Sequence, residues 1–202
     1  MNLGFLASFI ALIAVIYFSI RRQNKQYRQE EAAFWNRERR ANSVRRKSLD
    51  GLAYITIPLE TFPTRLLTEN TVVQECIDTL VSLTSRKIVN LTGWSNTDLK
   101  LEYGTANINL LAEYDQNYTV LVRTLQKWAD ELLAAGFQDE AAVLMDFAVN
   151  TGTDVGATYS KLADYRASRG QWEQIDLLIE KAQSLNSLNK DIILKHLREK
   201  SI

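Results

Sequence analysis

The chain has little of the chemistry that most metal and thiol sites need. Its 202 residues include one cysteine, Cys76, and one histidine, His196. A single thiol cannot close a disulfide within the chain, and one Cys with one distant His matches neither a zinc site nor a Cys–His catalytic pair. Cys76 falls on the apolar face of a predicted helix, so we expect it to be a small buried side chain.

Recognisable catalytic motifs are also missing from the sequence. It contains no P-loop, no GxSxG motif and no glycine-rich turn between a strand and a helix. Adjacent acids such as Asp130/Glu131 and Asp139/Glu140 point apart on a helix and are usually solvated. We therefore expect a protein that is not an enzyme, with no catalytic residues, no metal site and no cofactor.

Proline and glycine are scarce and charge is unevenly spread. Two prolines and eight glycines are too few for a linker or a fibrous protein. Residues 21–47 contain ten basic and three acidic side chains, a net charge of +7, whereas residues 48–202 have a net charge of −7. We expect no nucleic-acid binding, because the acidic part would repel phosphate.

One long hydrophobic run stands at the N-terminus. Leu3 to Ile20 reads LGFLASFIALIAVIYFSI and has no charged residue. Eighteen helical residues span about 27 Å, close to the thickness of a bilayer core. No basic residue precedes the run and no small-residue cleavage site follows it, which disfavours a signal peptide. We predict a transmembrane anchor over residues 1–20.

The basic residues that follow this run predict its orientation. Lys and Arg are retained on the cytoplasmic side of a membrane. We therefore expect a single-pass protein of the cell membrane, with the N-terminus outside and the C-terminal domain cytoplasmic.

Residues 21–49 form a basic juxtamembrane segment. They contain no proline or glycine, which favours a helix to about residue 41, followed by a linker. Two interpretations remain open: a solvated helix, or an amphipathic segment with Phe34 and Trp35 resting on the lipid surface. The candidate lipid-facing residues, which would contact anionic head groups, are Arg21, Arg22, Arg39, Arg40, Arg45 and Arg46.

The remaining residues, 50–202, predict an all-α domain with a short extended arm at its start. Both prolines lie within residues 50–66, where we expect an arm that packs on the helices through Ile55, Ile57, Leu59 and Phe62. Helix caps are predicted at Asn70 or Thr71, at Ser95 or Asn96, and at Gly104. A long helix is predicted over 116–135, and a final helix over 189–200 with Ile192, Ile193 and Leu197 facing inward.

The block over residues 90–115 is polar yet regular. It is equally compatible with a hydrogen-bond network that fixes the start of the domain and with a recognition surface. The polar residues concerned are Asn96, Asp98, Lys100, Tyr103, Asn107, Tyr114 and Asp115.

An internal repeat follows. Gly136 and Gly170 lie 34 residues apart, and each separates two apolar helical segments. A shift of 34 aligns Trp128 with Leu162, Ala129 with Ala163, Ala141 with Ile175, Leu144 with Leu178, Met145 with Ile179 and Ala148 with Ala182. Trp172, two residues after the second glycine, is expected to wedge into its hairpin.

This period and these residue types resemble the tetratricopeptide repeat over residues 118–185. The pattern is degenerate, because Gln138 replaces an aromatic residue and the proline after the second helix is missing in both units. A generic array of helical hairpins is the alternative. The layout as a whole, with the YITIPLETFP arm and the NLTGWSNTDLKLEYGTANINLLAEYD block, resembles small bacterial membrane-anchored proteins with tetratricopeptide-like cytoplasmic domains. That resemblance implies an architecture and no particular activity.

These features predict a membrane-tethered interaction module, a scaffold or adaptor for an unidentified, membrane-associated protein partner. The candidate partner-binding residues, on the first helix of each unit, are Arg123, Lys127, Tyr159 and Arg166. The alternative is a structural element that binds anionic lipid surfaces through its basic segment. An enzyme is the third and least favoured class.

Overall fold

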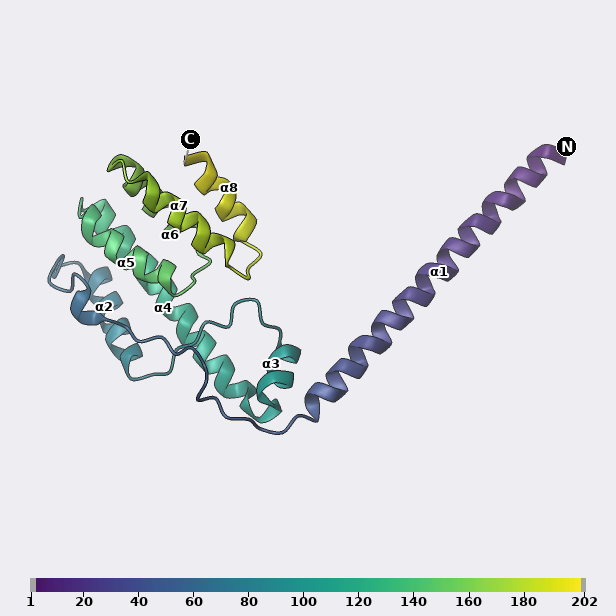
Figure 1. Cartoon of the computed structure of the whole chain (residues 1–202), viewed down its shortest axis with the longest axis horizontal. Coiled ribbons are helices and arrows are strands. Elements are labelled where there is room, and N and C mark those ends of the chain that lie inside the picture. Colours follow the sequence, from purple (N-terminus) through teal and green to yellow (C-terminus); the bar gives the residue numbers. More distant parts are fainter. Residues whose placement is uncertain (1–2, 201–202) are drawn as a thin grey trace. The chain divides into compact units, whose positions relative to one another are not determined.

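A computed structural model describes the backbone of residues 3–200 and the side chains of residues 11–200. Within this range the chain is all-α, as predicted, with eight α-helices, two short 3-10 turns and no β-strand. The first helices are α1 (Leu3–Asn42), α2 (Thr71–Thr84), α3 (Asn96–Tyr103) and α4 (Ile108–Ala134). They are followed by α5 (Gln138–Asn150), α6 (Gly156–Ser168), α7 (Trp172–Gln183) and α8 (Lys190–Lys200) (Figure 1).

The chain folds into two compact units. Unit 1 contains the chain up to Lys47 together with Ser95–Ile108, and unit 2 contains Ser48–Trp94 together with the chain from Asn109 on. Unit 1 joins α3 to α1, although the two helices lie far apart in sequence, and the predicted divisions at residues 20 and 49 stay a prediction. Composition and hydropathy follow the order of the chain, so they do not reveal such a contact between distant segments.

Helix α1 is uninterrupted from Leu3 to Asn42. No glycine or proline occurs between residues 5 and 50, so nothing in this stretch breaks the helical hydrogen bonds. Among the described residues, no helix has an apolar stretch that would take it across a membrane. The anchor predicted over residues 1–20 lies partly outside that description, which omits residues 1 and 2 and the side chains of residues 3–10.

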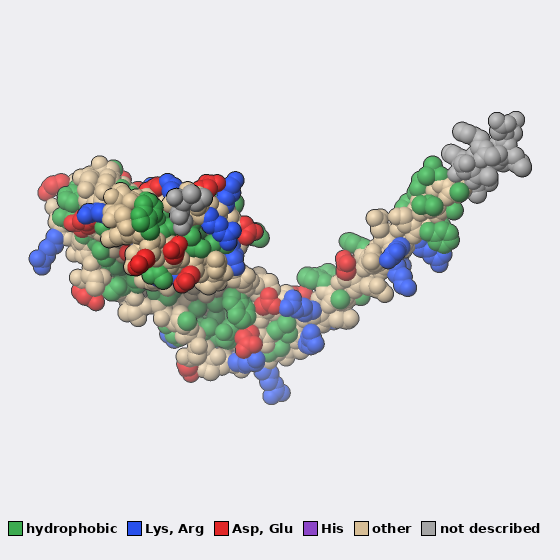
Figure 2. Space-filling model, turned by 45° about the horizontal axis from the view of Figure 1, so that its top comes forward, with side chains coloured by type: hydrophobic (Ala, Val, Ile, Leu, Met, Phe, Trp, Pro, Cys, Tyr) green, Lys and Arg blue, Asp and Glu red, His purple; other side chains and the backbone are tan. Residues whose placement is uncertain are grey.

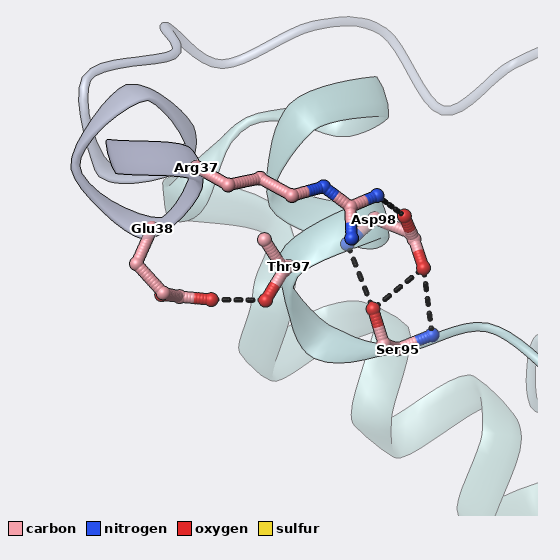
Figure 3. Close-up of polar contacts among 5 residues, drawn as sticks. All are labelled: Arg37, Glu38, Ser95, Thr97 and Asp98. Atoms are coloured by element: carbon pink, nitrogen blue, oxygen red, sulfur yellow. Dashed lines mark hydrogen bonds and ion pairs between the residues drawn. The ribbon is translucent and has the colours of Figure 1, made fainter. Parts of the chain in front are cut away.

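In unit 1, the last turns of α1 pack on α3 (Figure 3). The guanidinium of Arg37 binds the carboxylate of Asp98, and the hydroxyl of Thr97 donates to Glu38. Lys100 Nζ lies 3.0 Å from the Glu38 carboxylate. The pKa of Glu38 is lowered, mainly by the hydrogen bond from Thr97 and next by the bond from Lys100. Several charge-assisted contacts therefore join one helix to the other.

The predicted cap of α3 is present and takes part in the same cluster. Ser95 Oγ accepts a hydrogen bond from the Asp98 backbone N–H at 3.2 Å, and the Asp98 carboxylate accepts one from the Ser95 N–H at 3.3 Å. This reciprocal pair is a capping box. The bond from the Ser95 side chain lowers the pKa of Asp98. The carboxylate that begins α3 thus also receives Arg37 of α1.

Asn107 fixes the end of unit 1 from a fully buried position. Its amide nitrogen donates to the carbonyls of Lys47 and Tyr103, each at 2.8 Å, and its side-chain oxygen accepts from Arg46 Nε at 3.0 Å. This part of the polar block is therefore a hydrogen-bond network that organises the fold.

Unit 2 contains the larger hydrophobic core. The predicted arm lies against it, with Ile57 and Phe62 buried and Ile55 and Leu59 partly buried. The Phe62 ring meets the Trp128 ring edge-on, at 6.1 Å between centroids. Cys76 is also part of this core, as predicted, and burial raises the pKa of its thiol.

The 34-residue period appears in the structure as two helical hairpins, α4/α5 and α6/α7. Gly136 and Gly170 both have positive φ angles, +87° and +68°. After each glycine, the next backbone N–H returns to a carbonyl five residues earlier, from Phe137 and from Gln171, at 2.9 Å in both hairpins. Between the two hairpins, residues 34 apart are buried together in seven pairs: 125/159, 128/162, 129/163, 132/166, 141/175, 144/178 and 148/182.

The final helix, α8, covers the second hairpin and contacts both α6 and α7. Ile193 and Leu197 are buried as predicted, but Ile192 is 59% exposed and Leu194 is buried instead. The helix is rotated relative to the expectation, since neighbouring residues on a helix differ by about 100°.

Gly104, between α3 and the turn that follows, offers a test of unit 1. A Cβ at this position would lie 2.2 Å from the Arg45 carbonyl oxygen, and φ is +85°. Gly104→Ala should therefore destabilise unit 1 by about 2 kcal/mol or more. Hydrogen exchange of the α3 amides in the full-length chain measures the loss. Gly51→Ala is the control, because nothing lies within 4 Å of its Cβ; equal protection in the two variants would contradict the prediction.

Candidate functional site

A pocket opens in unit 2 at the turn end of the second hairpin, beside α5. Its volume is about 790 Å³, within the range of small ligand and side-chain sites. Its walls come from α5, from the end of α6 and from the turn that begins α7. The lining residues with functional side chains are Asp139, Asp146, Tyr165, Arg166, Trp172, Glu173 and Gln174.

Arg166 forms one wall and is only 8% exposed. It occupies the place that Leu132 has in the first hairpin, so a guanidinium stands at a repeat position that elsewhere is apolar. Its Nη1 donates to the Gln174 carbonyl at 2.8 Å, and its Nη2 binds the Asp146 carboxylate. Burial raises the pKa of Asp146, and the positive charge of Arg166 opposes that shift. Arg166 therefore ties α5, α6 and α7 together.

Asp139, at the start of α5, forms a second contact across the pocket mouth. Its carboxylate accepts a hydrogen bond from the Tyr165 hydroxyl at 2.8 Å and also binds the guanidinium of Arg169. The bond to Asp139 raises the pKa of Tyr165. Because the Asp139 side chain is 63% exposed, its oxygens also face solvent and can accept further donors.

Apolar surface lies next to these acids. Trp172 is 52% exposed and Val143 is 42% exposed, although both are large hydrophobic side chains. Trp172 was expected to wedge into its hairpin, but it is the first residue of α7, is half exposed and lines the pocket. The pocket thus combines carboxylates with an accessible aromatic surface.

The predicted partner-binding residues do not lie on one exposed surface. Arg123 and Lys127 are exposed on α4, and Lys127 Nζ lies 3.2 Å from Glu75 of α2. Tyr159 is 1% exposed in the core of unit 2, and Arg166 is also buried, in its ion pair with Asp146. Of the four, only Arg166 lines the pocket. The partner-binding surface itself stays a prediction.

The predicted lipid-facing residues fall into two groups. Arg21, Arg22, Arg39 and Arg40 are exposed along α1. Arg45 and Arg46 follow the helix, and Arg46 donates to Asn107.

In the part of the chain that the structure describes, no group of three or more His, Cys, Asp or Glu side chains converges on a point. The two unusual buried groups are the Trp128 indole N–H and the Tyr159 hydroxyl, which find no hydrogen-bond partner among the described residues. Comparison of the chain with protein-family models, with curated proteins and with solved structures found no match.

The buried Tyr159 hydroxyl leads to a prediction with a matched control. Tyr159→Phe removes a hydroxyl that has no partner, so the free energy of unfolding at pH 7 should stay the same or rise by up to about 1 kcal/mol. Tyr118→Phe removes a hydrogen bond of 3.1 Å to the Thr151 carbonyl and should lower it by about 1 kcal/mol. Urea denaturation of the two variants measures the difference. An equal loss of unfolding free energy in Tyr159→Phe and Tyr118→Phe would contradict the prediction, because it would mean that the Tyr159 hydroxyl has a hydrogen-bond partner.

The same residue predicts a pH dependence. Burial raises the pKa of Tyr159 from 10.0 to about 12. Between these values the folded chain retains a proton that the unfolded chain has lost, so stability must fall as pH rises through this window. Tyr159→Phe should show a shallower loss between pH 10 and pH 12. The slope of unfolding free energy against pH in both proteins checks this, and parallel slopes would contradict it.

The ion pair of buried Arg166 with partly exposed Asp146 gives a further prediction. Arg166→Ala leaves the Asp146 carboxylate and the Gln174 carbonyl without their donor and should cost about 2 kcal/mol of stability. Arg169→Ala is the control, because its pair with Asp139 is half exposed on both sides and should contribute about 0.5 kcal/mol or less. Chemical denaturation compares the two. Equal losses would mean that Arg166 adds no more than a surface pair.

Proposed function

We propose that this chain is a membrane-tethered protein-interaction module, a scaffold or adaptor without catalysis. In this proposal a tetratricopeptide-like helical array presents the pocket beside α5 to a basic segment of a partner protein. The observation that supports it most is the pocket itself, which places exposed Trp172 and Val143 next to carboxylates of α5.

The repeated hairpins support the interaction role. Stacked helical hairpins form extended surfaces, and such surfaces bind peptides or helices in grooves. Arg123 and Lys127 are exposed on the first helix of the first hairpin and stay candidate partner-binding residues outside the pocket.

The chemistry of the pocket favours a cationic partner. Three of its side chains, Asp139, Asp146 and Glu173, are acidic, and one, Arg166, is basic. Arg166 already pairs with Asp146 and Arg169 with Asp139, which leaves Glu173 and the exposed oxygens of Asp139 to attract an incoming charge. An Arg or Lys side chain would place its stem on the Trp172 face and its charge near these carboxylates.

The anchor places the module in this proposal. The uncharged run from Leu3 to Ile20 and the basic residues that follow it support an N-terminus outside and a cytoplasmic array at the cell membrane. Confinement to a membrane raises the effective concentration of a membrane-associated partner without any new contact.

Proximity labelling of the full-length chain tests this function. A labelling enzyme is fused to the C-terminus, and Val143→Lys, which adds a positive charge, is compared with the wild type. The substitution places a charge on the apolar side of the pocket, so it should remove a reproducible set of labelled proteins. One purified member of that set should bind the variant about tenfold more weakly, the effect of losing a well-packed apolar contact.

Val81→Lys on α2 is the matched control. Val81 is 51% exposed, so this variant introduces the same charge at an exposed valine outside the pocket. It should keep the labelled set. The proposal fails if no reproducible set is found, or if the two variants lose the same proteins.

A further inference from the structure

The basic side chains of α1 are not spread evenly around the helix. Arg21, Lys25 and Arg28 stand at i, i+4 and i+7, so they share one face. Glu30 falls about half a turn from this face and Glu31 about a quarter turn. Figure 2 shows Lys and Arg side chains gathered on one side of α1, next to hydrophobic side chains toward its N-terminus. The charge on this segment is therefore directional.

A shallow groove between exposed side chains follows the same face of this single helix and is open to solvent. Tyr17 and Ile20 line its N-terminal end, and both are more than half exposed. Arg21, Lys25 and Arg28 line the rest, together with small and uncharged polar side chains. We call these five residues the basic groove. Its character changes along the helix from apolar to cationic within three turns.

We infer that the basic groove binds an anionic phospholipid, with the phosphate on Arg21, Lys25 and Arg28 and the start of the acyl chain along Tyr17 and Ile20. This inference rests on the proposed membrane anchor. Along α1, apolar side chains come first and cationic side chains follow, which matches the order of acyl chain and phosphate head group in such a lipid. Arginine grips phosphate with two parallel N–H bonds, and lysine adds a point charge.

The straightness of α1 decides which basic residues reach the head groups. With the bilayer edge near Ile20, Arg28 lies about 12 Å beyond it, and its long side chain reaches back toward the phosphates. Arg39 lies about 28 Å beyond it along the same unbroken helix, more than two screening lengths of about 10 Å at ordinary ionic strength. Of the predicted lipid-facing residues, Arg39, Arg40, Arg45 and Arg46 are therefore not part of the site.

The test compares two variants with equal loss of charge. The full-length chain is reconstituted in phosphatidylcholine vesicles, and spin-labelled phosphatidylglycerol and phosphatidylcholine report which lipid associates with it. The wild type should prefer phosphatidylglycerol by about fivefold or more, the effect of one cation beside a lipid phosphate. The triple variant R21Q/K25Q/R28Q should lose this preference, and R39Q/R40Q/R45Q should keep it. Glutamine retains helix propensity, so α1 is preserved in both.

Equal association of the two lipids with the wild type would overturn the basic groove, as would an equal loss of preference in the two variants. Extraction at alkaline pH tests the anchor separately. If the chain leaves the vesicles, the anchor fails, and flotation with vesicles of phosphatidylcholine alone or with 30 mol% phosphatidylglycerol then measures the same preference. If the wild type floats with the phosphatidylglycerol vesicles and R21Q/K25Q/R28Q does not, the result would support the basic groove without the anchor. If the wild type floats with neither kind of vesicle, both the groove and the anchor would be overturned.

Discussion

Close approach of helices through alanine is the constraint on which unit 2 depends. Ala129 and Ala163 occupy the same position in the first helices of the two hairpins, and Ala148 and Ala182 occupy it in the second helices. All four are at most 1% exposed. The distance between packed helices is set by the side chains at the contact, so a larger residue here would push the hairpins apart. The pocket beside α5 lies where these hairpins meet, and its dimensions follow from that spacing.

Local signals in the sequence predicted local structure. Asn70 caps α2 by accepting from the N–H groups of Val72 and Val73, Ser95 caps α3, and Gly104 ends it. Each of these depends on a few neighbouring residues, so the chain itself contains the information. The membership of α3 in unit 1 could not be predicted in this way, because it depends on contacts with residues of α1 that are about 60 positions away in sequence. The buried Asn107, which closes that unit, was named among the residues of the polar block, but nothing in the neighbouring sequence distinguishes it as the buried one.

The candidate site was harder to predict, for a reason that the repeat makes clear. Tyr159 and Arg166 lie on the first helix of the second unit, where the partner-binding surface was predicted. The shift of 34 aligns them with Leu125 and Leu132, which are buried. The periodicity that identified the hairpins thus already indicated that both residues are interior. Likewise, Trp172 aligns with Gln138, a polar residue at the start of a helix, and this was the signal that the indole would be exposed.

The unbroken course of α1 has a consequence of angle as well as length. Lys25 lies on the face of the basic groove, whereas Glu38 and Ala41 meet α3 from nearly the opposite side of the same helix. Each added residue turns the helix by about 100°, so one inserted residue between them would swing α3 around the axis, and seven would bring it almost back. The number of residues between Lys25 and Glu38 therefore sets the angle about the α1 axis between the basic groove and α3. Their number matters more for this angle than their identity. A helix without a hinge preserves orientation, and in unit 1 it fixes which way α3 faces once the other end of α1 is held.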